Sequence, residues 1–106
     1  MNPARPILEL ESLLERLWTE TEALGQMTED AAIAEVAAKT SYAKALLQAE
    51  GTVSERESRA TVASEDELLA RRLAEAKLLT QRELLQTLRV EIDGLRTLNA
   101  NQRAST

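Results

Sequence analysis

The stretch from Ser64 to Leu98 constrains the fold of this chain more than any other, because it has the pattern of one long amphipathic helix. Its apolar residues recur at alternating intervals of three and four, and Gln81 is the one interruption. This spacing is typical of a coiled-coil seam. The seam residues are Leu78, Leu85, Leu88, Ile92 and Leu95. At 1.5 Å per residue the helix would be roughly 50 Å long, so we expect an elongated molecule.

The start of this helix is marked by a capping box. Ser64 is followed three residues later by Glu67, and each side chain can bind a backbone N–H of the first turn. Glu65 and Asp66 add negative charge where the helix dipole favours it. The long helix is therefore expected to span residues 64–98, with a flexible polar tail at 99–106.

Composition points to an all-α chain folded as a single helical domain over residues 1–106. The chain has no Phe, one Trp, one Tyr, three Gly and two Pro, so its core must be built from Leu, Ala, Ile and Val. Cysteine and histidine are absent, which excludes disulfides, thiolate ligands and imidazole bases. With no phosphate-binding loop or nucleophile motif either, we expect no catalytic, cofactor-binding or metal-binding residues, and hence no enzyme.

Two further helices precede the long one. Helix one is expected over residues 6–24, ended by Gly25, and helix two over residues 29–50, capped by Thr28 and ended by Gly51. Helix one has a predicted packing or self-association seam, in which Trp18 is interpreted as a core residue. Helix two has a seam of its own, with alanines that allow close packing. The two sets are Leu10, Leu14 and Leu17 in helix one, and Ile33, Val36, Thr40, Ala43 and Leu47 in helix two.

Residues 52–63 are predicted to be a connector with one or two helical turns, since they offer little apolar surface. A bend here would fold helix two and the long helix into an antiparallel, coiled-coil-like hairpin covered by helix one. If residues 52–63 were helical throughout, helix two and the long helix would instead merge into one rod. We favour the bend.

Four arginines recur every seven residues, so they form one ridge on the long helix. A row of guanidinium groups can follow a nucleic-acid backbone, but coiled-coil flanks have the same pattern. The ridge is therefore a candidate contact for nucleic acid or for a protein partner. Its members are Arg82, Arg89, Arg96 and Arg103.

Charge is distributed unevenly along the chain. Residues 1–50 carry nine acidic and four basic side chains, whereas residues from Leu68 onward carry seven basic and four acidic ones. The two parts could pair within a hairpin or between subunits, and with so small an aromatic core we expect a homo-oligomer. No apolar run reaches the roughly 18 residues of a membrane span, so we expect a soluble protein.

Two elements in the second half are similar to a known group of proteins. The first is E-G-T-V-x-x-R around Gly51 and Arg56, and the second is Leu-Arg-x-x-Ile-x-x-Leu-Arg from Leu88 to Arg96. Together they resemble small helical proteins of the early regions of tailed bacteriophages and prophages, often encoded beside recombination or replication genes. The resemblance implies a phage accessory protein in the cytoplasm of a bacterial host, acting through protein contacts.

The functional hypothesis is accordingly a non-enzymatic adaptor or regulator of a recombination or replication complex. Three alternatives remain open at this point: direct nucleic-acid binding along the arginine ridge, a scaffold or virion component, and an inhibitor of a host protein whose basic groove an acidic helix could occupy.

Overall fold

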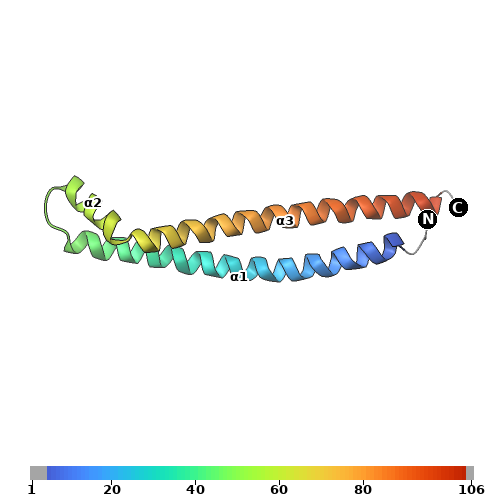
Figure 1. Cartoon of the computed structure of the whole chain (residues 1–106), viewed down its shortest axis with the longest axis horizontal. Helices are drawn as coiled ribbons and strands as arrows, with labels where there is room; N and C mark the ends of the chain where they lie inside the picture. Colours follow the sequence, from blue (N-terminus) through green and yellow to red (C-terminus); the bar gives the residue numbers. More distant parts are fainter. Residues whose placement is uncertain (1–4, 105–106) are drawn as a thin grey trace. The chain divides into compact units, whose positions relative to one another are not determined.

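Helix accounts for nearly all of the computed structural model, which describes residues 5–104 (Figure 1). The three helices are α1 (Arg5–Gln48), α2 (Val53–Ala63) and α3 (Glu65–Ala104). Among the described residues only 49–52 and Ser64 are not helical. The prediction of an all-α fold with a long C-terminal helix is confirmed.

The chain divides into two compact units. One unit combines Met1–Gly25 with Thr80–Thr106, and the other is Gln26–Leu79. The first therefore contains the beginning of α1 and the end of α3, while the second contains the rest of α1, all of α2 and the beginning of α3.

The core of the first unit is a coiled-coil-like seam between two antiparallel helix segments (Figure 1). On α3 the three-four spacing predicted from the sequence is the spacing that the structure buries. Leu85 and Leu88 are 1% exposed and Ile92 is 3% exposed, with Leu95 half-buried beyond them. Leu78 lies half-buried on the same line of α3, in the second unit.

The facing line on α1 differs by one residue from the expected seam. Leu10 and Leu17 are half-buried as expected, but Leu13 takes the position between them and Leu14 lies on the flank. Spacing permits either set, since 10, 13, 17 and 10, 14, 17 both have intervals of three and four. Packing on α3 selects Leu13, and Leu14 is rotated by about 100° from it toward the flank.

A polar contact interrupts the apolar seam of the first unit. Gln81 is 6% exposed, and its side-chain amide donates to the Glu20 carbonyl oxygen at 2.8 Å and to Glu20 Oε2 at 2.7 Å. The glutamine that breaks the sequence pattern is therefore inside the seam, with its amide donating to a partner on the facing helix.

The break expected at Gly25 is absent, because α1 runs without interruption from Arg5 to Gln48. Gly25 does not adopt the left-handed conformation of a helix cap, since Gly51 is the one glycine with positive φ among the described residues. Half-buried residues continue at three-four spacing on both sides of Gly25, as Leu24, Met27 and Ala31. Tertiary packing thus outweighs the cost of a glycine within the helix.

The second unit is packed through small side chains. Ala38 of α1, Ala60 of α2 and Ser64 between α2 and α3 are all fully buried. Ser64 Oγ donates to the Ala60 carbonyl oxygen at 2.6 Å. This corrects the expected capping box with Glu67, because the serine hydroxyl is used to close the end of α2 instead of capping the start of α3.

The predicted connector 52–63 is mostly a helix of 11 residues, α2. Thr52 caps it, accepting a hydrogen bond from the Glu55 N–H at 3.2 Å. A single non-helical residue, Ser64 at φ −105° and ψ 17°, separates α2 from α3. The connector therefore neither unwinds nor merges with the long helix.

The expected flexible tail at 99–106 is also helical as far as it is described, since α3 continues to Ala104. Asn99 and Gln102 continue the three-four spacing beyond Leu95 and lie half-buried, which gives these residues a helical packing position. Residues 1–4 and 105–106 lie outside the described part.

Candidate protein-binding faces

The predicted seam of helix two is on the outside of the second unit. Ile33, Val36 and Leu47 are 68%, 64% and 82% exposed. This is a correction to the sequence-based interpretation. Because α1 is continuous, the phase set by Leu10 and Leu17 carries on along the helix, and small side chains such as Ala38 face inward instead.

We call the exposed residues Ile33, Val36, Thr40, Ala43 and Leu47 the outer stripe. They keep the three-four spacing of a coiled-coil seam, yet all five are exposed. Along part of the outer stripe the surface is hollowed into a shallow groove, whose other wall includes Glu67 of α3. The groove is lined by Ala32, Ile33, Val36, Ala37, Thr40, Ser41, Lys44 and Glu67.

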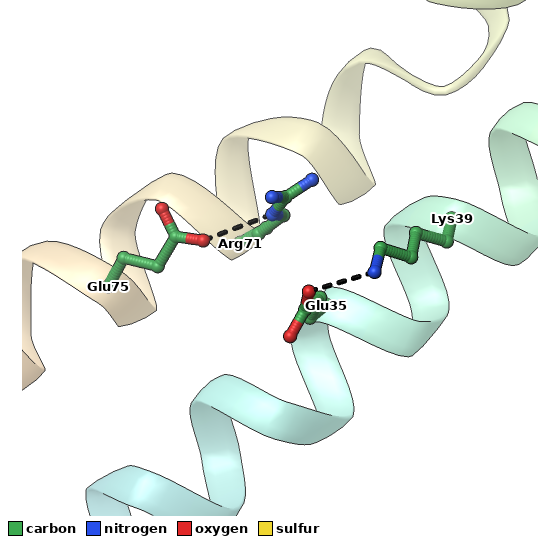
Figure 2. Close-up of polar contacts among 4 residues, drawn as sticks. All are labelled: Glu35, Lys39, Arg71 and Glu75. Carbon is green, nitrogen blue, oxygen red and sulfur yellow. Dashed lines mark hydrogen bonds and ion pairs between the residues drawn. The ribbon is translucent and has the colours of Figure 1, made fainter.

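Basic residues border the outer stripe. Lys44 lines the groove and has no polar partner among the described residues. Lys39 is ion-paired with Glu35 at 3.0 Å, and on α3 Arg71 is ion-paired with Glu75 at 3.0 Å (Figure 2). The hydrogen bond from Lys39 and then its charge lower the pKa of Glu35, and the more distant charge of Arg71 adds to the effect.

The first unit has two flanks, one on each side of its seam. One flank holds a second groove, lined by residues from both helices: Glu9, Ser12 and Leu13 of α1, and Glu91, Gly94, Leu95 and Leu98 of α3. Gly94 has open space where a Cβ would lie. Among the described residues, no other helix therefore approaches Gly94 closely enough to require a glycine there.

The predicted arginine ridge lies on the opposite flank. Arg82 and Arg89 each follow a seam residue of α3, just as Leu14 follows Leu13 on α1. In an antiparallel pair, residues at equivalent positions of the two helices lie on the same side. The arginines of α3 therefore share a flank with Leu14 of α1, and we call this surface the arginine face. Its members are Ile7, Leu14 and Trp18 of α1, and Arg82, Arg89, Arg96 and Arg103 of α3.

Trp18 is the functional candidate that sequence reasoning misplaced. It was expected in the core, but it is 70% exposed, one residue beyond Leu17 on the side of the arginine face. Spacing gave no signal against a core position, because Ile7, Leu14 and Trp18 form an apolar stripe of their own on α1.

The element around Gly51 and Arg56 has a structural role. Gly51 turns the chain at φ 112° after α1. Arg56 then donates from its guanidinium to the Leu46 carbonyl oxygen at 3.1 Å, and Arg59 donates to the Glu50 carbonyl oxygen at 2.5 Å. Arg56 therefore binds a carbonyl group in the last turn of α1, where helix carbonyls lack intrahelical partners, and Arg59 binds one just after the helix ends.

Within residues 5–104 no three acidic side chains come together as a group that could hold a metal ion. Neither does any described helix have a stretch long and apolar enough to cross a membrane. No protein-family model, curated protein or solved structure matches the chain.

Proposed function

We propose that this chain is a non-enzymatic adaptor that binds a helix of a partner protein along the outer stripe. The observation that supports the proposal is the exposure of a complete three-four repeat on α1, from Ile33 to Leu47, beside a seam that the chain has already filled. Repeats of this kind are stable when a second helix covers them.

The chemistry of the outer stripe defines the partner. A partner helix with apolar residues at the same spacing can place these side chains in the groove beside Val36 and Thr40. Lys44 borders this groove, and Lys39 lies on the other side of the stripe. The partner helix should therefore carry Asp or Glu on its flanks.

The resemblance to phage early-region proteins supports a recombination or replication protein as the owner of that helix. The element around Gly51 and Arg56 builds the turn between α1 and α2. This element therefore ends the outer stripe near Leu47, and we assign it a structural role.

The experiment compares the wild-type chain with the double variant Ile33→Glu, Val36→Glu and with the control Leu79→Glu. All three residues are exposed, so each variant is expected to keep the helical circular dichroism spectrum. Partners are captured from extract on the immobilised chain, identified by mass spectrometry, purified and titrated against each variant.

We expect the double variant to lose at least tenfold in affinity, because two buried charges replace two apolar anchors, while Leu79→Glu binds as the wild type does. Hydrogen exchange in residues 33–47 should slow when the partner is bound. Equal binding by both variants would refute the proposal. Assembly of the chain alone into large particles would favour a scaffold role.

A further inference from the structure

We propose that the partner helix lies on α3 as well as on α1, along a channel that runs from Lys44 to Lys77, and that this helix is acidic at both ends and basic in its middle. The inference rests on the proposed function, because it specifies the partner of the same surface. It adds a contact on α3 and an order of charges that the outer stripe alone does not give.

A second depression continues the groove beside the outer stripe. We call it the Leu73 hollow, and it is lined by Met27 and Asp30 of α1 and by Ala70, Leu73, Ala74 and Lys77 of α3. All six residues belong to the second unit, as the groove does. Leu73 is 54% exposed, so the hollow has an apolar wall that the chain itself leaves uncovered.

The groove and the Leu73 hollow lie on the same side of both helices. On α1, Asp30 of the hollow is seven residues before Ala37 of the groove, and Lys44 follows after seven more. On α3, Ala74 of the hollow is seven residues after Glu67 of the groove. Residues at intervals of seven share one side of an α-helix. The two depressions therefore follow one another, and together we call them the channel.

The channel suits a third helix packed on two. Ile33 and Val36 of α1 are 68% and 64% exposed along its first part, and Leu73 of α3 offers a further apolar contact in the second. Ala37 and Ala74 are small, so a partner helix can approach both helices closely. Apolar residues of the partner are then covered by α1 and α3 together.

Charged residues follow one another along the channel in a fixed order. In the second unit α1 and α3 are antiparallel, since low residue numbers of α1 share the hollow with high residue numbers of α3. From the Leu47 end the order is therefore Lys44, Glu67, Asp30 and Lys77. This is a base, two acids and a base, so the complementary helix has an acid, two bases and an acid.

The neighbouring charges agree with this order. Asp66 is seven residues before Leu73, and Glu29 is seven residues before Val36, so both add negative charge to the middle of the channel. Lys39 lies on the other side of the outer stripe and is ion-paired with Glu35 at 3.0 Å. The middle of the channel is therefore acidic when the flanking residues are counted.

The four charges of the channel are available to a partner. Lys44, Glu67 and Lys77 have no polar partner among the described residues. Asp30 accepts one hydrogen bond from the Gln26 amide at 3.0 Å on its own helix. Lys44 and Asp30 are 14 residues apart, or about 21 Å along α1. The partner helix therefore needs about four turns or more.

The probes are two synthetic helical peptides of about 25 residues, long enough to cover the channel. Both have the same apolar three-four repeat and equal numbers of Glu and Lys. The Glu-ended peptide has Glu near its ends and Lys in its middle, and the Lys-ended peptide has the reverse. Fluorescence anisotropy of the labelled peptides measures their affinity for the wild-type chain and for each variant.

The charge-swapped variant carries Lys44→Glu, Glu67→Lys, Asp30→Lys and Lys77→Glu, which leaves the net charge at −5. Leu73→Glu removes the apolar wall of the hollow. Leu79→Glu is its matched control, because Leu79 is exposed and rotated by about 120° around α3 from Leu73. Lys77→Glu is a single exposed change that tests the far end of the channel. Circular dichroism checks that each chain remains helical.

We expect the wild type to bind the Glu-ended peptide at least about tenfold more tightly than the Lys-ended peptide, and the charge-swapped chain to reverse this preference. Leu73→Glu should weaken binding at least about tenfold, while Leu79→Glu binds as the wild type does. Lys77→Glu should weaken binding of the Glu-ended peptide alone, which tests the charge order even if the charge-swapped chain does not fold. The purified partner protein should show the same loss with Leu73→Glu.

Equal binding of the two peptides by the wild type would overturn the inference, and so would an unchanged preference in a folded charge-swapped chain. If Ile33→Glu, Val36→Glu loses the partner and Leu73→Glu keeps it, the contact on α3 is wrong while the adaptor proposal stands. Failure of the wild type to bind any of these helices would contradict both. Self-association of the chain that Leu73→Glu abolishes would overturn the inference and assign the channel to a second copy.

Discussion

Gln81 and Glu20 meet inside the seam of the first unit, where the glutamine amide donates to both the backbone carbonyl and the carboxylate of the glutamate. The other buried side chains of this seam are Leu85, Leu88 and Ile92, and the contact of Gln81 with Glu20 is satisfied in one register of the two helices. A slip of either helix would bury the amide of Gln81 without a partner, which is costly. The pair therefore selects the register of α1 against α3.

Replacement of Gln81 by Ala should lower the free energy of unfolding by about 1–3 kcal/mol, because a buried hydrogen bond to a carboxylate is lost. Gln86→Ala on the exposed side of α3 is the control and should change stability by less than about 0.5 kcal/mol. Urea unfolding followed by circular dichroism measures both. Equal stabilities of the two variants would show that the contact does not contribute.

Ala38 is fully buried, so a larger side chain has no room there. Ala38→Leu should destabilise the second unit by at least about 1–3 kcal/mol through overpacking. Ala76→Leu makes the same change at an exposed position of α3 and should be nearly neutral. Thermal unfolding of the two variants compares them directly, and an Ala38→Leu protein as stable as the wild type would contradict the close packing at this position.

The three glycines should respond to alanine in opposite directions. Gly25 and Gly94 are helical, and the space that an alanine methyl group would occupy is open, so alanine should stabilise each helix by up to about 1 kcal/mol. Gly51 has φ 112°, and a Cβ there would collide with the Glu55 side chain, so Gly51→Ala should destabilise. Chemical denaturation of the three variants tests the signs, and a stabilised Gly51→Ala would be inconsistent with the turn.

Arg56 joins α2 to the end of α1 through the Leu46 carbonyl oxygen. Arg56→Ala should cost about 1–3 kcal/mol, since the carbonyl loses a charged donor and the packing of the side-chain stem is lost. Arg72→Ala, at an exposed position of α3, serves as the comparison. Hydrogen exchange should quicken in residues 53–63 of the Arg56 variant alone, and unchanged exchange there would argue against this link.

The pKa of Glu35 lies below its usual value of 4.5, chiefly because of the hydrogen bond and charge of Lys39. A lowered pKa in the folded state means that the pair stabilises the fold above pH 4.5 and loses this effect as pH falls through the lowered pKa. Lys39→Ala should raise the Glu35 pKa in a carbon-detected NMR titration, and Arg71→Ala should raise it less. A larger rise of the Glu35 pKa in the Arg71 variant would contradict the assignment of Lys39 as the main cause.

The seam of α3 could be predicted from the sequence because its spacing is local information. Leu85, Leu88 and Ile92 are separated by intervals that place them on one side of any α-helix, and they are the side chains that the structure buries. The cap at Thr52 was predictable for the same reason, since it involves residues three apart in the chain.

The candidate faces were harder to predict because α1 carries more than one apolar stripe. Leu10, Leu13 and Leu17 compete with Ile7, Leu14 and Trp18 on the same helix, and spacing alone does not say which set meets α3. Ile33 and Val36 are exposed because α1 continues through Gly25, so the inward side of its first half remains the inward side of its second half. Considered by itself, Gly25 predicts the end of a helix instead.

By itself, the sequence determined that the chain is helical, which residues of α3 form a seam, and that the arginines at intervals of seven form a ridge, because each depends on helix geometry within one segment. Only the tertiary structure decided which stripe of α1 faces inward, that Gln81 binds Glu20, and that Trp18 shares a flank with the arginine ridge. These relations join residues 61 or more apart in the chain, and they are set by how one helix packs on another.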